Sequence, residues 1–273
     1  MRGLVPPGWP RFAGAAWRRL GVFASGVACL VTLSVSPTLS VSAAGALDAR
    51  QAVEAFVNRL AGAQINDVTI RQTVTLYHPD GRFPQSTGEQ TLIVKLPARQ
   101  RVEQMLEGKR EVRLTVGDRT WVRRSDGTVA ETGSERDRTR VLVPAARSGP
   151  ALLSEWRALG IREEVTSSAR LRGRVVTVIG AESGDRTSPA VWLDPEYGVV
   201  RLVAKEWLAG GSASLVDLTF SEHRPLQAGF YFPHRQEAFA DGRLLLLITV
   251  RSVTLNTNPP DGLFDPATLR RER

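Results

Sequence analysis

Apolar side chains recur at every second position over much of this chain, which is the period of a β-strand. Between residues 65 and 77, Val68, Ile70, Val74 and Leu76 alternate with threonines and an arginine. This alternation predicts a strand with one buried face and one face in water. Similar runs, separated by turn residues, lie at 89–96, 101–106, 111–116, 120–124, 174–180, 190–193 and 199–207. Together they predict an antiparallel meander.

The last third of the chain, residues 215–264, extends this meander with a large apolar surface. Asp241-Gly242 stands between two β-rich runs and is among the strongest short-range signals for a hairpin. The five residues of Leu244–Ile248 are all apolar, so this strand presents apolar side chains on both faces. Two interpretations are open: a fully buried central strand, or a strand with one face on a ligand cavity and the other under a helix.

Two segments show the helical period instead. The first, residues 47–60, has Asp48 placed to cap its N-terminus and Gly62 placed to end it. Its apolar face consists of Val53, Phe56, Val57 and Leu60. The second begins at Ser148 and ends at Gly160, and its apolar face consists of Leu152, Leu153, Trp156 and Leu159. Each apolar face predicts a helix that packs on the sheet.

The segment 131–150 breaks the strand pattern. It is rich in arginine and contains two prolines, which predicts a solvated loop, with a short strand at 141–143 as the alternative. The order of elements contains no strand–helix–strand alternation, so parallel nucleotide-binding folds are disfavoured. We expect one mainly β (α+β) domain over 44–273: a single curled antiparallel sheet, a half-barrel of roughly ten strands, with two or three covering helices.

Residues 1–43 have the three-part pattern of a secretory signal peptide. They carry four arginines and no acidic residue, followed by an apolar run and small residues before Ala43 and Ala46, where we expect cleavage. An uncleaved membrane anchor is one alternative, because the run nearly reaches the length of a membrane span. A lipid attached to Cys29 is the other. Export to the periplasm, or to another location outside the cytoplasm, is the expectation.

Composition excludes several classes of function. Residues 44–273 carry 32 basic and 28 acidic side chains, scattered along the chain, so no nucleic-acid partner is expected. Cys29 is the only cysteine, and its removal with the signal would leave no disulfide or thiol chemistry. The three histidines, His78, His223 and His234, are interpreted as exposed turn residues, so neither a metal nor another cofactor is expected.

Four loose motifs resemble the periplasmic lipoprotein carriers, the LolA/LolB-like superfamily with its related lipid-binding and envelope-stress sensor domains. They are Leu96–Arg101, Val116–Trp121, Val191–Gly198 completed by Arg201, and Val253–Asn256 followed by Leu263-Phe264-Asp265. Their order and spacing cover roughly residues 47–266. The chain departs from the pattern by extra length around 131–150, and by Gln100 and Val102 where some carriers have large aromatic residues.

The resemblance implies a hydrophobic cavity on the concave side of the sheet that holds acyl chains of lipids or lipoproteins without catalysis. It also implies contacts with inner- and outer-membrane proteins of the envelope, and we expect a monomer. Arg99 and Arg101 are candidates to contact a head group or to tie down a lid. The candidate cavity-lining residues are Phe56, Trp121, Trp156, Trp192, Trp207, Phe220, Phe230, Phe232, Leu244, Leu246 and Ile248.

Two rival functions remain open. The same apolar face would also suit an envelope sensor or regulatory domain that binds a membrane-anchored protein. A hydrolase could draw carboxylates from Glu163-Glu164, but these read as solvated charge beside a helix end. The motifs G-x-S-x-G, H-E-x-x-H and the P-loop do not occur in the sequence. A non-enzymatic binder is therefore the expectation.

Overall fold

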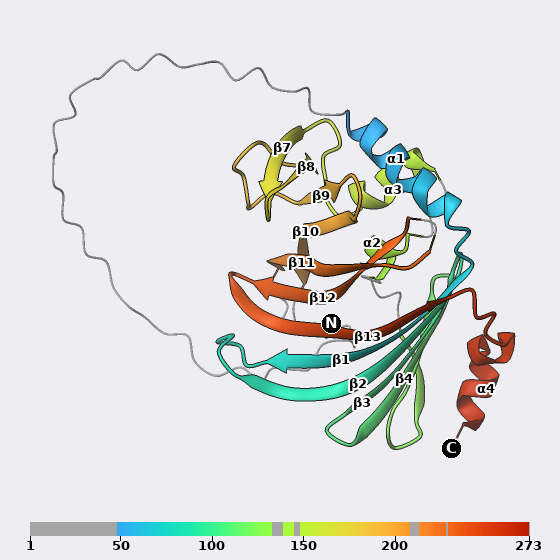
Figure 1. The fold of residues 1–273 in the computed structure, drawn as a ribbon. Helices are drawn as coiled ribbons and strands as arrows, with labels where there is room; N and C mark the ends of the chain where they lie inside the picture. The colour runs from blue at the N-terminus through green and yellow to red at the C-terminus, as the bar shows by residue number, and fades with distance from the viewer. Residues whose placement is uncertain (1–47, 133–138, 145–147, 208–212, 228, 273) are drawn as a thin grey trace, which may run out of the picture.

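The computed structural model describes residues 48–132, 139–144, 148–207, 213–227 and 229–272. Thirteen strands in this part of the chain form one antiparallel sheet that is not closed into a barrel (Figure 1). The predicted fold class is confirmed, and the expected count of roughly ten strands is wrong. Short strands such as β6 (Val129–Thr132) and β7 (Thr166–Leu171), at the two edges of the sheet, account for part of the difference.

The sheet consists of two meanders that meet in its middle. The N-terminal meander contains β1 (Asp67–Tyr77), β2 (Pro84–Lys95), β3 (Arg99–Leu106), β4 (Lys109–Val116), β5 (Arg119–Arg123) and β6. The C-terminal meander contains β7, β8 (Arg174–Ile179), β9 (Ala190–Asp194), β10 (Gly198–Trp207), β11 (Ala213–Pro225), β12 (Tyr231–Ala240) and β13 (Arg243–Leu255). The first strand pairs with the last, β1 with β13, which joins the two meanders into one sheet.

This topology explains why the segment between β6 and β7 is not a simple solvated loop. Because β6 and β7 are opposite edges of the sheet, the chain between them must cross from one edge to the other. The described parts of this connection are 139–144, which includes α2 (Thr139–Leu142), and 148–165, which includes α3 (Gly149–Arg157). Val141, Leu142 and Val143 are buried in the main core, so the prediction of a solvated loop is wrong there.

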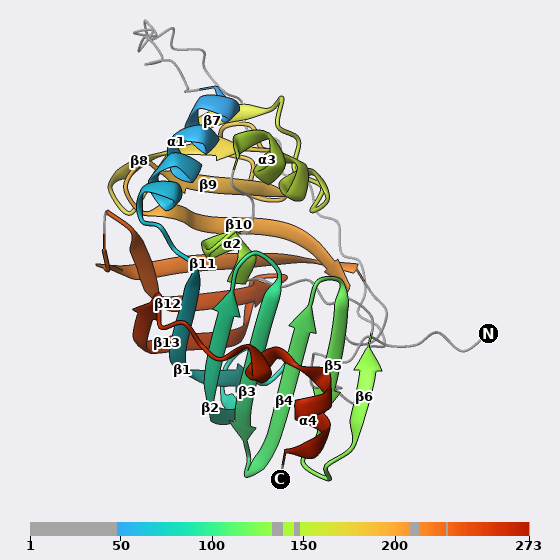
Figure 2. The same ribbon diagram turned by 90° about the vertical axis from the view of Figure 1, so that its right-hand side faces the viewer.

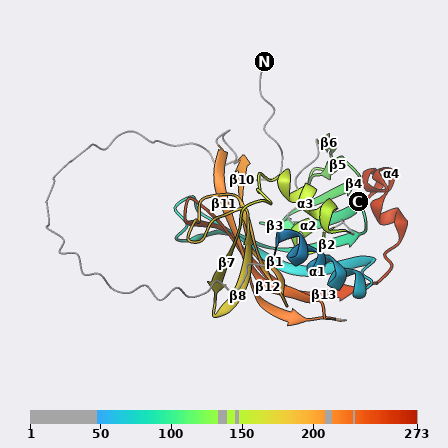
Figure 3. The ribbon, with the colours of Figure 1, turned by 90° about the horizontal axis from the view of Figure 1, so that it is seen from above.

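Helices cover the concave side of the sheet, as predicted. The first helix, α1 (Ala49–Gly62), is capped by Asp48 and packs beside α3, which is capped by Ser148. Figures 2 and 3 show α1, α2 and α3 together on one side of the curled sheet. Their apolar faces share one core with side chains from β1, β2 and β8–β13. Among the described residues, no helix combines the length and the apolar character needed to cross a membrane.

The opposite, convex face carries two smaller apolar clusters. One lies under the C-terminal segment, η1 (Asp261–Phe264) and α4 (Pro266–Arg271), which runs over β3, β4 and β5 (Figure 2). The other consists of side chains from β8, β9 and β10 around Trp192. The predicted hairpin at Asp241-Gly242 is present: both residues have positive φ, 49° and 77°, as a two-residue type I′ turn requires.

Candidate ligand-binding cavity

A cavity of about 100 Å³ lies between the concave face of the sheet and α2. Strands β1, β2, β11, β12 and β13 form its walls, and Leu142 of α2 contributes to it from the helical side. The register explains the grouping, because Val74, Ile248, Gln236 and Phe220 are successive cross-strand partners and so share one face. The lining consists of Ile70, Gln72, Gln90, Leu92, Leu142, Leu218, Phe220, Phe232, Gln236, Glu237, Ala238, Leu246 and Ile248.

Four of the predicted lining residues are brought together in this cavity: Phe220, Phe232, Leu246 and Ile248. They come from three neighbouring strands, β11, β12 and β13. The apolar run Leu244–Ile248 therefore belongs to a strand that borders the cavity through Leu246 and Ile248, while Leu245, at a register shift between β12 and β13, is buried outside the lining. The strand is central in the sheet, but of these five residues only Leu245 is buried, so it is not a fully buried strand. The interpretation of one face on a cavity is supported, but the helix α2 lies on that same side.

Other predicted residues pack in the core without lining the cavity. Phe56 of α1 and Trp156 of α3 are 4% and 2% exposed and belong to the concave core. Phe230 stands beside the lining residue Phe232, with ring centroids 6.4 Å apart in an edge-on arrangement. Leu244 is half-buried but is absent from the lining. These side chains support the walls of the cavity, apart from Leu244, which lies toward the end of its strand.

Two predicted tryptophans lie on the convex face instead. Trp121 packs under the C-terminal segment with Phe264 and Leu269, and Trp192 packs among valines of β8 and β10. The guanidinium of Arg201 stacks over the Trp192 ring at 4.3 Å. Periodicity along one strand cannot tell which face of the sheet is concave, so it could not separate these residues from the cavity. The side chain of the predicted Trp207 lies outside the residues that the structure describes.

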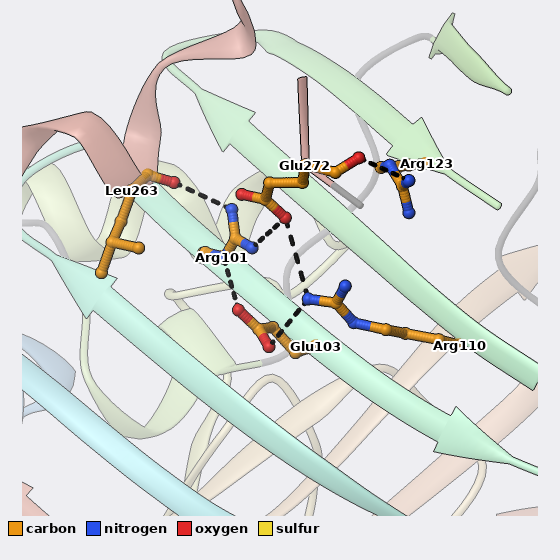
Figure 4. Close-up of polar contacts among 6 residues, drawn as sticks. All are labelled: Arg101, Glu103, Arg110, Arg123, Leu263 and Glu272. Atoms are coloured by element: carbon orange, nitrogen blue, oxygen red, sulfur yellow. Dashed lines mark hydrogen bonds and ion pairs between the residues drawn. The ribbon is translucent and has the colours of Figure 1, made fainter. Parts of the chain in front are cut away.

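Arg99 and Arg101 both form hydrogen bonds with the C-terminal segment, and Figure 4 shows those of Arg101. Nη1 of Arg99 donates to Asp261 at 2.8 Å. Arg101 is 2% exposed and donates to Glu103 Oε1 (2.7 Å), to the carbonyl oxygen of Leu263 (3.2 Å) and to Glu272 Oε2 (2.8 Å). These contacts fasten η1 and α4 to the convex face, and they occupy both guanidinium groups away from the cavity.

Glutamines are the cavity residues that pattern reading missed. Gln72 has the same parity along β1 as Ile70 and Val74 and is 5% exposed. Gln90 stands opposite it on β2, and Gln104 stands opposite Gln90 on β3. Their amides are linked, since Nε2 of Gln72 donates to Gln90 Oε1 and Nε2 of Gln90 donates to Gln104 Oε1 at 2.9 Å. The sequence does contain a signal for these glutamines, namely a polar residue at an inward-facing position in each of several successive strands.

The size of the cavity limits what it holds without rearrangement. A volume of about 100 Å³ is smaller than the ~150 Å³ engineered cavity that accepts benzene. Typical ligand pockets are larger still, at roughly 300–1,000 Å³. In this structure the space accommodates a short piece of an acyl chain, and a longer piece requires lining side chains to move.

A second polar cluster lies outside the cavity. Arg174 on β8 makes a bidentate pair with Asp194 (2.6 and 3.0 Å), and its guanidinium lies 4.2 Å over the ring of Tyr197. The His223 ring also stacks on Tyr197, with centroids 4.7 Å apart and the two rings nearly parallel. His223 is half-buried and His234 is 5% exposed, so the prediction of exposed histidines is wrong for these two and right for His78.

This cluster perturbs two groups. Burial lowers the pKa of His223 to about 4, so its imidazole is neutral at pH 7, and its Nε2 has no hydrogen-bond partner within the described chain. Burial alone would raise the pKa of Asp194, but hydrogen bonds from Arg174 and from the backbone N–H groups of Tyr197 and Glu196 outweigh it and lower this pKa. Within the part of the chain described, no three metal-ligating side chains gather as an ion site would need.

Comparisons with known proteins identify the fold. No protein-family model matches the chain, and a search of curated protein sequences finds no significant match. Solved structures do match. A putative outer membrane lipoprotein-sorting protein domain from Vibrio parahaemolyticus is 14% identical, with a TM-score of 0.55 over 82% of this chain and 100% of that one.

A second match is a DUF1329 family protein from Desulfovibrio piger, 10% identical, with a TM-score of 0.52 over 82% of this chain and 100% of that one. The chain thus shares its fold with a putative outer membrane lipoprotein-sorting protein domain and with a DUF1329 family protein. The expected resemblance is confirmed at the level of the fold. At these identities the likeness concerns architecture, and the function requires a separate argument from the residues.

Proposed function

We propose that this protein is a non-enzymatic binder or carrier of lipid or lipoprotein acyl chains in the cell envelope, and that the cavity under α2 is its binding site. The observation that carries the proposal is the apolar cavity itself, walled by five strands and bordered by Leu142. The fold shared with a putative lipoprotein-sorting domain supports it. The proposal does not specify a particular lipid or a partner protein.

The chemistry of the lining favours binding over catalysis. Nine of its side chains are apolar and three are glutamines. The remaining one, Glu237, accepts hydrogen bonds from Arg235 (2.7 Å) and Thr219 (3.3 Å), so its carboxylate is already occupied. A nucleophile with an adjacent base is absent from this set of lining residues. The proposal is therefore that the protein holds its ligand and releases it unchanged.

Energetics require the cavity to open further for a full chain. Each buried methylene contributes about 0.8 kcal/mol, while association costs at least several kcal/mol. A piece short enough for the observed volume does not offset that cost. We therefore propose that side chains of the lining move when ligand binds. Leu142 is the best candidate, because it comes from a four-residue helix, whereas the other lining residues belong to the hydrogen-bonded sheet.

We also propose that residues 1–43 are a cleaved export signal, as the sequence predicts. N-terminal sequencing of the protein recovered from a periplasmic fraction tests this proposal, with Ala44 or Leu47 expected as the first residue. Retention of the intact N-terminus in the membrane fraction would instead support the anchored alternative.

The binding test uses the uncharged apolar probe N-phenyl-1-naphthylamine, titrated into protein produced with its N-terminal segment in place. We expect saturable binding by the wild type, and its loss in Leu246→Trp, because Leu246 lines the cavity and the larger ring fills it. Leu244→Trp is the matched control: the same substitution, two residues away on β13, at a half-buried position outside the lining. Unchanged binding by Leu246→Trp, with retained folding, would remove the cavity as the site.

A further inference from the structure

We infer that the cavity contains a polar subsite, formed by Gln72, Gln90 and Gln236, that takes the uncharged polar group of an acyl ligand, such as an ester or amide, and disfavours a free carboxylate. This inference rests on the proposed function and deepens it. It concerns which acyl ligands fit, whereas the proposal above concerns whether the cavity binds acyl chains at all.

The first observation is the arrangement of the amides on the cavity wall formed by the N-terminal meander. Gln72, Gln90 and Gln104 are direct cross-strand partners on β1, β2 and β3, and a directed chain of hydrogen bonds links them. In this row of hydrogen bonds, Oε1 of Gln72 receives no hydrogen bond from any described residue, and protein atoms do not seal that oxygen off. Since Gln72 lines the cavity, the cavity is where its acceptor is available.

The second observation comes from the opposite wall. Gln236 on β12 also lines the cavity, and its amide makes no hydrogen bond with any described residue. Gln236 stands opposite Ile248 on β13, and Gln72 stands opposite Val250 of the same strand. Two amides thus face one apolar space across a single strand. Neither amide is sealed from solvent, and Gln236 is half-buried. A ligand that covered these amides without pairing with them would leave them unsatisfied at a cost in free energy, and a ligand that pairs with them avoids that cost.

Amides can bind either kind of uncharged partner. An amide offers both an acceptor oxygen and two N–H donors, and a linked row of amides reverses its direction by flipping every member together. In one direction Gln72 accepts from a hydroxyl or amide N–H, and in the other it donates to an ester or amide carbonyl. The subsite therefore matches the uncharged linkage between an acyl chain and the group that carries it.

The charges around the cavity argue against a carboxylate. No lysine, arginine or histidine is among its lining residues, and Glu237 is the one charged member. An ionised carboxylate moved into this space would lose its hydration without gaining a cation, which is far more costly than burying an ester. A free fatty acid would have to leave its carboxylate outside the cavity or bind more weakly.

The experiment compares three ligands of equal chain length at pH 7.5: methyl laurate, laurate and dodecane, each displacing N-phenyl-1-naphthylamine from the full protein. We expect methyl laurate to displace the probe at concentrations about 3- to 10-fold lower than either of the others, the range that one net hydrogen bond gives. Equal potency of ester and carboxylate would overturn the subsite and leave acyl binding intact. Failure of all three to displace a bound probe would overturn acyl binding, and the subsite with it.

Variants locate the effect. In Gln72→Leu the advantage of the ester over dodecane falls below about 2-fold, while dodecane binds as before or better, because an apolar group of similar size replaces the amide. Gln85→Leu is the matched control, since Gln85 lies on β2 but is exposed and outside the lining. Thermal unfolding checks that both variants fold. An ester advantage that persists in folded Gln72→Leu would contradict the role of this glutamine row.

Discussion

Arg101 on β3 and Glu272 beyond α4 form an ion pair of 2.8 Å although 171 residues separate them in the chain. The Arg101 side chain is 2% exposed and that of Glu272 is 19% exposed. Figure 4 also shows Glu103, Leu263, Arg110 and Arg123, with Arg123 donating to the carbonyl oxygen of Glu272 at 2.7 Å. The last residues of the chain are thereby fixed to the convex face, opposite the cavity.

Replacing this arginine is expected to destabilise the fold. Arg101→Met leaves Glu103 and Glu272 without their buried cation, and we expect a loss of ~2–4 kcal/mol in the free energy of unfolding, measured by urea denaturation. Arg110→Met is the control. Its side chain is 36% exposed and its Nη2 lies 3.5 and 3.7 Å from the same two carboxylates, so its loss should cost less than about 1 kcal/mol. Equal losses in the two variants would contradict the central place of Arg101.

Enlarging the cavity should separate binding from stability. Leu142→Ala removes a buried side chain from the cavity wall, so we expect a loss of ~2–4 kcal/mol in stability together with tighter binding of apolar ligands. Leu269→Ala makes the same substitution at a fully buried position in α4. It should cost a similar amount without changing ligand affinity. Titration of both variants with N-phenyl-1-naphthylamine, beside their urea curves, gives the comparison, and equal affinity in the two would argue against α2 as the movable wall.

The stability should fall as the solution becomes mildly acidic. The pKa of His223 in the folded protein is about 4, below the ordinary value of about 6.5, so the unfolded chain binds the proton more readily. The contribution of neutral His223 is complete above about pH 6.5 and is lost as the pH falls toward 4. Because the side chain is only half-buried, we expect a loss of roughly 1–3 kcal/mol across this window.

His223→Phe isolates that effect, because phenylalanine keeps the stack on Tyr197 without a titrating group. Urea denaturation at pH 7, 6, 5 and 4 should show a smaller slope of stability against pH in this variant than in the wild type. His78→Gln is the control at an exposed position and should retain the wild-type slope. A slope unchanged by His223→Phe would mean that other groups dominate the pH response.

Two aspartates that each pair with an arginine differ in burial, so their substitution compares a buried carboxylate with a more exposed one. Asp194 is 1% exposed and accepts from Arg174 and from two backbone N–H groups, whereas Asp217 is 30% exposed and accepts only the bidentate pair from Arg201. We expect Asp194→Asn to cost ~2–4 kcal/mol and Asp217→Asn about 1 kcal/mol, measured by urea denaturation at pH 7. A larger loss of stability in Asp217→Asn than in Asp194→Asn would contradict the greater importance of the buried aspartate.

Local pattern was sufficient for most of the individual elements. The alternation in β1, the Asp241-Gly242 turn and the capped helices α1 and α3 all depend on residues close in sequence, so they could be predicted. Helix α2 could not, because its four residues carry no helical period. What holds Val141 and Leu142 is the core they enter as the chain crosses between the two edges of the sheet.

The candidate site could be predicted only in part, because local sequence patterns do not reveal how strands are arranged in the sheet. The two-residue period of a strand places Leu246 and Ile248 on one face of β13, and both line the cavity. It could not tell that Trp121 and Trp192 face the convex side, which depends on how the sheet curls. Nor could it reveal that Gln72, Gln90 and Gln104 form one row, because that requires the register between three strands.

The amino-acid sequence by itself therefore determined most of the strands, the main turns, the two longer helices and the apolar character of the closing third of the chain. Those features follow from periodicity and from residues within a few positions of one another. The tertiary structure alone decided that β1 pairs with β13, that α2 borders a cavity and that Arg101 holds the C-terminal segment. These contacts join residues far apart in the chain, and only the curl and register of the whole sheet bring them together.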